Sequence, residues 1–172
     1  SDRLLGLVDD ILDLEKIEAG KMDFKMESID VRDLVAEALQ NYRTYGSRLG
    51  VEFKSNSLAE PAMIDGDRNR LLQVMANLMS NAAKFSEPGD GPGIPEEARP
   101  SLFEPFTQLY KQTSTKLNGT GLGLTIVKAI VERHEGSIDF RSELGKGTTF
   151  FFDLPSYEPR RTGSDIDVVE AA

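Results

Sequence analysis

The sequence has no cysteine, no tryptophan and a single histidine, His134, among its 172 residues. The absence of cysteine excludes a disulfide framework and any thiolate metal site. A single histidine excludes most zinc sites, and it excludes a Ser-His-Asp triad unless His134 serves in it. No apolar run approaches the ~20 residues that a membrane helix needs, and the first residues do not resemble a signal peptide. We therefore expect no direct membrane contact from this chain.

Positive charge is also scarce, because 20 lysine and arginine residues face 29 aspartate and glutamate residues, for a net charge of −9. This balance argues against a nucleic-acid partner and against binding to an anionic membrane. A local phosphate site is not excluded, since backbone amides can form one without net positive charge. With 39% hydrophobic and 28% charged residues, the composition is that of a globular protein.

The first 20 residues show apolar positions at alternating steps of three and four, which predicts a helix that ends at Gly20. The stripe consists of Leu4, Leu7, Ile11 and Leu14, widened by Leu5, Val8 and Leu12. A stripe this wide needs a partner. Periodicity alone leaves two alternatives open, a helical bundle or dimer and a helix folded onto its own domain.

The remaining pattern predicts an α+β fold, with helices on one face of a mixed or antiparallel sheet. Expected strands lie at 22–26, 51–53, 62–64, 137–142 and 148–154. Asp30 and Asp67 are the expected N-caps of two helices, the second running to about Phe85. A short helical piece reaches Phe103, and another helix covers 122–134.

The long helix carries a polar stripe that is unusual for a solvated helix face. It consists of Gln73, Asn77, Asn81 and Lys84, opposite Leu71, Met75, Leu78 and Ala82. Asparagine is a poor former of helix interiors. An amide oxygen can instead ligate Mg²⁺, and an ammonium group can neutralise a phosphate oxygen. The stripe therefore favours a surface for a hard cation and phosphate, with a merely exposed face as the alternative.

A glycine-rich loop, Gly119-Thr120-Gly121-Leu122-Gly123, opens the helix predicted at 122–134. Glycine lets a backbone pass close to a ligand, and a helix N-terminus presents free N–H groups to an anion. The loop is not a Walker A motif, because no Gly-Lys-Ser/Thr follows, and its spacing differs from the dinucleotide-binding fingerprint. Further glycine pairs at 91–93 and 145–147 indicate little by themselves.

Taken in order, these motifs resemble those of sensor histidine kinases. Residues 77–86 resemble the N box, 91–95 the end of the G1 box, 103–106 the F box, 119–124 the G2 box, 145–148 the last glycine motif, and 12–20 the end of the second dimerisation helix with its linker. The resemblance covers roughly residues 1–155. It implies a two-layer α/β sandwich, the Bergerat-type ATP-binding fold of the gyrase, Hsp90, histidine kinase and MutL superfamily, preceded by a helix of a dimeric four-helix bundle.

This resemblance divides the chain into three parts and assigns a role to the motif residues. Residues 1–20 would be the end of the dimerisation helix with its linker, 21–155 the catalytic ATP-binding domain, and 156–172 a tail or linker. Asn77, Asn81 and Lys84 would be the catalytic set, with Asn81 as the Mg²⁺ ligand. Residues 107–118 would form a mobile ATP lid. The residues expected at ATP are Asn81, Lys84, Asp90, Gly91, Gly93, Ile94, Phe106, Gly119, Thr120, Gly121, Leu122, Gly123 and Thr148.

The implied reaction is transfer of the γ-phosphoryl group of ATP to a histidine. No carboxylate lies on the stripe at 73–84, so nothing there is placed to activate water, which favours transfer over hydrolysis by a stand-alone ATPase. The acceptor histidine of the family would lie upstream of Leu4, outside this sequence, and we expect His134 to be structural. The resemblance further implies a homodimer through the N-terminal helix, a response regulator receiver domain as partner, and a cytoplasmic location. It leaves open whether the full-length protein is membrane-attached.

One departure from the family lies between the N box and the G1 box. Residues 86–90 run directly into Gly91, where the family has a strand hairpin that needs about 12–20 residues. Either a segment has been deleted near 86–91, or the sequence joins two pieces across a gap. The aspartate that contacts adenine in the family would stand at Gly89, and Asp90 is one residue too close. A degenerate, non-catalytic signalling or dimerisation module of the same fold is therefore the alternative function.

Overall fold

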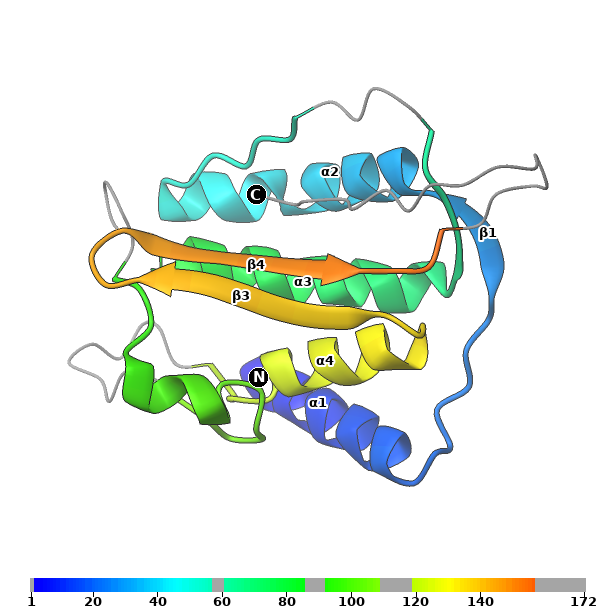
Figure 1. Cartoon of the computed structure of the whole chain (residues 1–172), viewed down its shortest axis with the longest axis horizontal. Coiled ribbons are helices and arrows are strands. Elements are labelled where there is room, and N and C mark those ends of the chain that lie inside the picture. Colours follow the sequence, from blue (N-terminus) through cyan, green and yellow to red (C-terminus); the bar gives the residue numbers. More distant parts are fainter. Residues whose placement is uncertain (1, 57–60, 86–91, 109–118, 157–172) are drawn as a thin grey trace.

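The computed structural model of the chain describes residues 2–56, 61–85, 92–108 and 119–156, with side chains from residue 6 onwards in the first helix. Its elements, labelled in Figure 1, are α1 (Asp2–Glu18), β1 (Glu27–Asp30), α2 (Val31–Leu49), β2 (Met63–Gly66), α3 (Arg68–Phe85), the 3₁₀ helix η1 (Glu96–Ser101), α4 (Gly123–Arg133), β3 (Ser137–Glu143) and β4 (Gly147–Asp153). In this part of the chain, no helix combines the length and the apolar character that crossing a bilayer requires.

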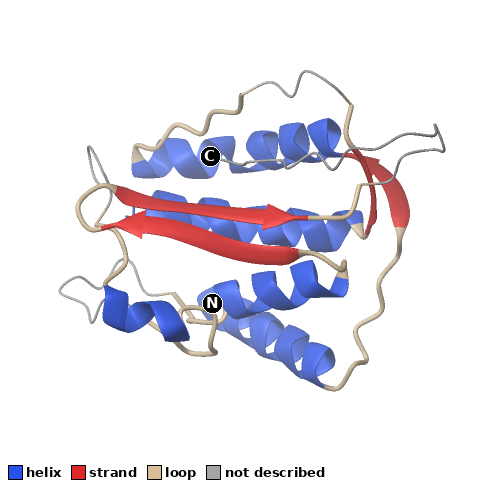
Figure 2. Ribbon diagram, in the orientation of Figure 1, coloured by secondary structure: helices blue, strands red, loops and turns tan. Residues whose placement is uncertain are grey.

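The strands form two antiparallel pairs. In the first pair Ile29 of β1 lies opposite Ile64 of β2, and in the second Phe140 of β3 lies opposite Phe150 of β4. Figure 2 shows the β3–β4 pair lying over the helices, with α3 and α4 directly beneath it. The fold is mixed α+β, as the sequence predicts.

The core is centred on α4. One cluster joins Val74 of α3 to Leu122 and four residues of α4, all of them fully buried: Ile126, Val127, Ile130 and Val131. Leu7 and Leu14 of α1 pack against this cluster from one side, and Ile138 and Phe152 of the β3–β4 pair pack from another. A second cluster, Ile29, Leu34, Ile64 and Leu71, joins the β1–β2 pair to α2 and α3.

Two predicted strands do not form. Residues 22–26 contain no strand, although Met22 is buried and Phe24 packs against the α4 cluster. The alternation therefore predicted the burial of Met22 and the packing of Phe24 correctly, but Met26 is 53% exposed. It did not predict a ladder, because a ladder also needs a neighbouring backbone. Residues 51–53 likewise stay irregular: the Val51 N–H donates to the Gly46 carbonyl at the end of α2 at 2.9 Å. The strand expected at 62–64 is observed one to two residues later, as β2.

The apolar face of α3 is broader than predicted. Leu71 is buried as expected, but Ala82 is exposed, whereas Val74, Met79 and Ala83 are buried. The reason is that α3 is covered by α2 on one side and by α4 on another, so two apolar faces are needed. The tail expected from Ser156 lies outside the described residues, apart from Ser156 itself, which bridges to Ile64.

His134 and Asp67 form a buried polar junction between α3 and α4, with exposures of 4% and 6%. The Asp67 N–H donates to Nε2 of His134 at 2.9 Å, and Nδ1 lies 2.7 Å from the Ile130 carbonyl. A carbonyl only accepts, so Nδ1 carries the proton and the imidazole is neutral. His134 thus has the structural role that the sequence suggested.

The Asp67 carboxylate caps α3 and ties it to the preceding loop. It accepts the N–H groups of Lys25 at 2.8 Å and Arg70 at 3.0 Å. Burial by itself would raise the pKa of Asp67, but the backbone donors at Lys25, Arg70 and Asn69 outweigh it, so the pKa lies below its ordinary value.

We expect Asp67→Asn to lower the free energy of unfolding by about 1–2 kcal/mol, because the backbone N–H groups of Lys25 and Arg70 lose a charged acceptor. The pKa of Asp67 is lower in the folded than in the unfolded chain. Its contribution to the free energy of unfolding is therefore present above about pH 3.9, the pKa of an unfolded aspartate, and is lost as the pH falls further. Urea unfolding from pH 7 down to pH 3 checks both points. The exposed Asp65→Asn is the control, and an equal effect of the two variants would contradict the assignment.

Candidate functional site

The polar stripe of α3 meets the glycine loop at the start of α4. Nδ2 of Asn77 donates to the carbonyl of Gly123 at 3.2 Å. Within the loop, the Leu122 N–H donates to Oγ1 of Thr120 at 3.2 Å. The structure thus brings together two motifs that are separated by more than 40 residues in sequence.

Asn81 and Lys84 are half-buried on the last turns of α3, beyond Asn77. Among the described residues, the Asn81 side chain has no hydrogen-bond partner, so its amide oxygen is available to a ligand. The N-cap residue of α4, Leu122, has an apolar side chain and makes no side-chain capping hydrogen bond. A helix start of this kind presents N–H donors and a positive partial charge to an anion.

Residue 121 must be a glycine because the backbone of Phe106 passes close to the loop at this point. It has φ +75°, and a Cβ there would lie 2.8 Å from the Cα and carbonyl carbon of Phe106. Phe106 itself has φ 61° and is 63% exposed. Oγ1 of Thr125 donates to the carbonyl of Phe103 at 3.0 Å, which attaches residues 103–106 to α4.

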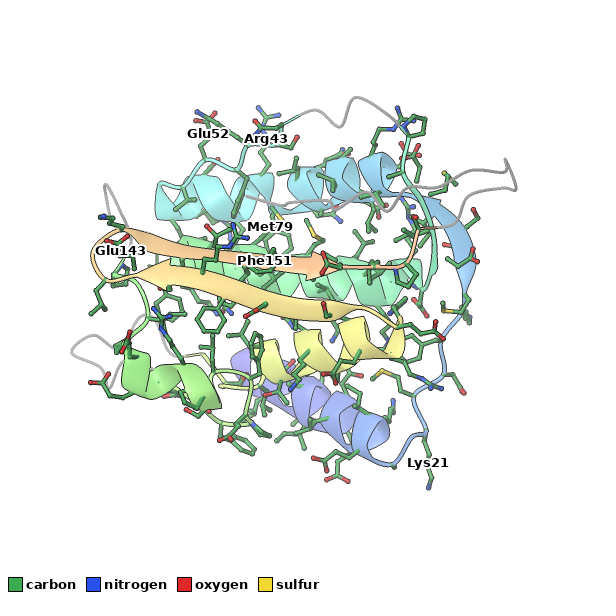
Figure 3. The ribbon with its side chains drawn as sticks, viewed as in Figure 1. Lys21, Arg43, Glu52, Met79, Glu143 and Phe151 are labelled. Atoms are coloured by element: carbon green, nitrogen blue, oxygen red, sulfur yellow. The ribbon has the colours of Figure 1, made fainter. Side chains whose placement is uncertain are left out.

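The other predicted contacts gather at the turn of the β3–β4 pair. The Ile94 N–H donates to Oγ of Ser142 at 2.7 Å, and that hydroxyl lies 2.8 Å from Oγ1 of Thr148. Gly93 has φ +75°, and a Cβ there would collide with the carbonyl oxygen of Glu143. Figure 3 shows Glu143 at this turn. Gly93, Ile94 and Thr148, all predicted at ATP, are therefore neighbours.

Figure 1 shows the end of α3, the start of α4, η1 and the turn of the β3–β4 pair on the same side of the molecule. Asp90, Gly91 and residues 109–118 of the expected lid lie outside the described residues. The residues that flank this lid segment are joined, because Nε2 of Gln108 donates to the carbonyl of Gly119 at 2.9 Å.

The structure adds two carboxylates that the stripe alone did not predict, both from α1. Oδ2 of Asp10 accepts the Thr120 hydroxyl at 3.0 Å. One turn later, Asp13 accepts Nε2 of Gln73 at 2.8 Å and Nη1 of Arg70 at 3.2 Å. The expectation that no carboxylate lies on the stripe is true of α3 itself, but α1 brings two beside it.

Burial raises the pKa of Asp10, and the charges of Asp13 and Asp9 add to this rise, whereas the Thr120 hydrogen bond and the charge of Lys84 oppose it. The net direction is upward. Asp10 and Asp13 are spaced by three on α1, like Arg70 and Gln73 on α3. The equal spacing of acidic residues on one helix and of hydrogen-bond donors on the other is compatible with a helix–helix contact. The spacing does not indicate which two helices are in contact.

Comparison with known proteins assigns a class to this site. The family described as "Histidine kinase-, DNA gyrase B-, and HSP90-like ATPase" matches residues 89–158. The chain is 36% identical over 180 residues to "Autoinducer 2 sensor kinase/phosphatase LuxQ" of Vibrio vulnificus (strain YJ016), covering 90% of this chain and 21% of that protein. It is 34% identical over 198 residues to "Circadian input-output histidine kinase CikA" of Synechococcus elongatus, covering 99% of this chain and 26% of that protein.

A solved structure agrees with these relatives. Full-length ShkA in complex with AMPPNP matches with a TM-score of 0.75 and 28% identity, over 90% of this chain and 36% of that one. The family match and the fold therefore define an ATPase domain of the histidine kinase, gyrase B and HSP90 class. Within that class, the chain contains the ATP-binding catalytic domain of a sensor histidine kinase. The resemblance seen in the motifs is thus confirmed.

We expect Gly121→Ala to destabilise the chain by about 1–3 kcal/mol, because the new methyl group would require a positive φ and would press on the Phe106 backbone. Gly119→Ala is the matched control, since its Cβ would meet only the Gly121 nitrogen, at 4.0 Å, and its φ is not positive. Thermal unfolding of both variants without nucleotide checks the difference. Equal melting temperatures would contradict the role assigned to Gly121.

Proposed function

We propose that this domain binds Mg·ATP between the end of α3 and the start of α4 and transfers the γ-phosphoryl group to a histidine outside this chain. The observation that carries the proposal is the hydrogen bond from Asn77 to Gly123, which holds the polar stripe against an uncapped helix N-terminus. The ShkA structure, described as a complex with a nucleotide analogue, supports it. The chain covers only 21% of LuxQ and 26% of CikA, so the activity of the whole protein belongs to this proposal.

The phosphates would be held by charge and by backbone donors. Gly119, Thr120, Gly121, Leu122 and Gly123 would surround them, because N–H groups at a helix start are anion donors that need no side chain. Lys84 would neutralise a phosphate oxygen. A net charge of −9 does not prevent this, because the donors act at short range within the site.

The metal would be held by Asn81, whose amide oxygen has no hydrogen-bond partner in the described part of the chain. No group of three or more His, Cys, Asp or Glu residues suited to a metal is found there either. An amide oxygen fits Mg²⁺, which takes oxygen ligands and keeps several waters beside a few protein groups and the substrate phosphates. When bound, Mg²⁺ would neutralise phosphate charge in the transfer step.

The adenine would lie near Gly93, Ile94 and Thr148, with Phe106 and the lid closing over the nucleotide. The Ser142 hydroxyl joins Ile94 to Thr148, so this end of the site depends on the β3–β4 turn. Asp90 and Gly91 would complete it. Ser142 is a supporting residue that the sequence motifs did not indicate.

Transfer is favoured over hydrolysis because the α3 stripe at 73–84, on which the proposed Mg²⁺ and phosphate ligands lie, carries no carboxylate to activate water. The two α1 carboxylates beside it are engaged with the protein, Asp10 with Thr120 and Asp13 with Gln73 and Arg70. Catalysis would then consist of positioning and charge neutralisation, as phosphoryl transfer generally does.

The two separate strand pairs fit a Bergerat-type sandwich that lacks a segment near residues 86–91. An alignment of 180 residues covering 90% of 172 leaves about 25 positions of LuxQ without a counterpart here, enough for a hairpin and its loop. In this arrangement residues 21–155 form the catalytic domain, 1–20 the dimerisation helix and linker, and 156–172 a tail. An intact-mass measurement would show whether the protein contains such a segment.

The outer face of α1 supports a homodimer through a four-helix bundle. Leu7 and Leu14 pack against the α4 cluster, whereas Val8, Ile11 and Leu12 are 44%, 38% and 50% exposed. These three residues are spaced by three, four and one, so they share a face of the helix. The helix thus covers its own domain and keeps a second apolar face for a partner.

The downstream partner would be a response regulator receiver domain, and the domain would act in the cytoplasm. Both are what the resemblance to sensor histidine kinases implies.

We expect Asn81→Ala to weaken Mg·ATP binding at least about tenfold and to abolish the difference between affinities measured with and without Mg²⁺. Isothermal titration calorimetry on the 172-residue chain measures both. Asn41→Ala, exposed on α2, is the control and should bind like the unchanged chain. Absence of binding by the folded, unchanged chain at millimolar nucleotide would contradict the proposal and favour a degenerate signalling module.

We expect Leu12→Glu to shift the chain towards the monomer, because a charge would enter the apolar face that two copies bury. Sedimentation velocity over a range of concentrations measures the distribution. Leu144→Glu is the control, since Leu144 is 63% exposed but lies at the β3–β4 turn. The highest concentrations should reach about 0.1–1 mM, where even weak contacts form. If the unchanged chain stays monomeric there, dimerisation through α1 is contradicted.

A further inference from the structure

The inner face of α1 is polar where it crosses the site. Asp10 and Asp13 lie on the side that faces α3 and α4, whereas the exposed apolar residues of α1 lie on the other side. Asp13 is paired with Arg70, so its charge is compensated. Asp10 is different, because its closest partner is a neutral hydroxyl, that of Thr120.

Thr120 connects Asp10 to the helix start. Its Oγ1 donates to Oδ2 of Asp10 at 3.0 Å and accepts the N–H of Leu122 at 3.2 Å. The Asp10 carboxylate therefore lies one hydroxyl away from the donors that would hold the phosphates. Lys84 is near enough to act on Asp10 electrostatically, and Asp9 and Asp13 add negative charge around it.

We infer that Asp10 is a positioning residue that opposes the terminal phosphate of the nucleotide, and that it couples the docking of α1 to nucleotide occupancy. The inference rests on the proposed function. Asp10 holds α1 against the glycine loop by accepting the Thr120 hydroxyl. A bound triphosphate competes for the same hydroxyl and for Lys84, and it repels the carboxylate across a partly buried region where screening is weak.

Such a contact works in both directions. If docked α1 weakens nucleotide binding, then bound nucleotide weakens the docking of α1 by the same factor. The outer face of α1 is the face proposed for dimerisation, so occupancy of the site would bias the position of the dimer helix. No additional element is needed, because α1 contacts α4 directly.

Asp10→Asn tests the inference, because it removes the charge and keeps an oxygen to accept the Thr120 hydroxyl. We expect the dissociation constant for Mg·ATP to fall by about three- to tenfold, with a smaller change for Mg·ADP, which lacks the terminal phosphate. Glu15→Gln is the control: it removes the same charge from an exposed position on α1 and should change neither constant. Melting temperatures are measured in parallel to confirm that the variants are folded.

Three outcomes are distinguishable by calorimetry. A gain in affinity over the unchanged chain that is larger for Mg·ATP than for Mg·ADP, in Asp10→Asn and not in Glu15→Gln, supports the inference. Unchanged or weaker ATP binding in Asp10→Asn, with the unchanged chain binding normally, overturns the inference but leaves the proposed function intact. No binding by any folded variant overturns both.

Hydrogen exchange of the α1 backbone amides tests the coupling itself. We expect Mg·ATP to speed exchange over residues 7–14 in the unchanged chain and to have a smaller effect in Asp10→Asn. Slower exchange in α1 on adding Mg·ATP to the unchanged chain would overturn the coupling.

Discussion

The attachment of α4 to α3 is the constraint on which the rest of the structure depends. The two helices share the fully buried cluster around Ile126 and Ile130, and apolar packing of this kind is strong but not directional. Direction comes from polar contacts at both ends of α4. Asn77 bonds to Gly123 at its start, and His134 accepts the Asp67 N–H at its end. Because these contacts lie at opposite ends of α4, they hold the two helices in one register, and the polar stripe meets the glycine loop.

This arrangement explains how an acidic chain could offer the anion site that we propose. The site needs few charged side chains, since an uncapped helix start and glycine-loop amides supply donors that the backbone already contains. It does need exact backbone placement. Two positions require glycine for this reason. A methyl group at Gly121 would collide with the Phe106 backbone, and one at Gly93 would collide with the Glu143 backbone. Two of the glycines in the motifs thus serve backbone packing as well as any approach of a ligand.

The sequence predicted the features that depend on neighbouring residues, and it missed those that depend on contacts between distant residues. The helices α3 and α4 and the strands β3 and β4 were predicted within about two residues, because caps and periodicity are properties of neighbouring residues. The strands expected at 22–26 and 51–53 failed because a ladder requires a distant partner. The same distinction holds at the site: the stripe and the loop were visible as motifs, whereas Asp10, Asp13 and Ser142 enter it only through the way remote elements pack.

The position of α1 links the candidate site to the proposed dimer interface. Its inner face carries Asp10 against the glycine loop, and its outer face carries Val8, Ile11 and Leu12. The two faces are separated by one helix diameter, about 10–12 Å. A small rotation or shift of α1 therefore changes both surfaces together, because a helix moves as a rigid unit. Communication between the nucleotide site and a dimer interface would then require no pathway through the core, only an equilibrium between docked and undocked α1 that both sides bias.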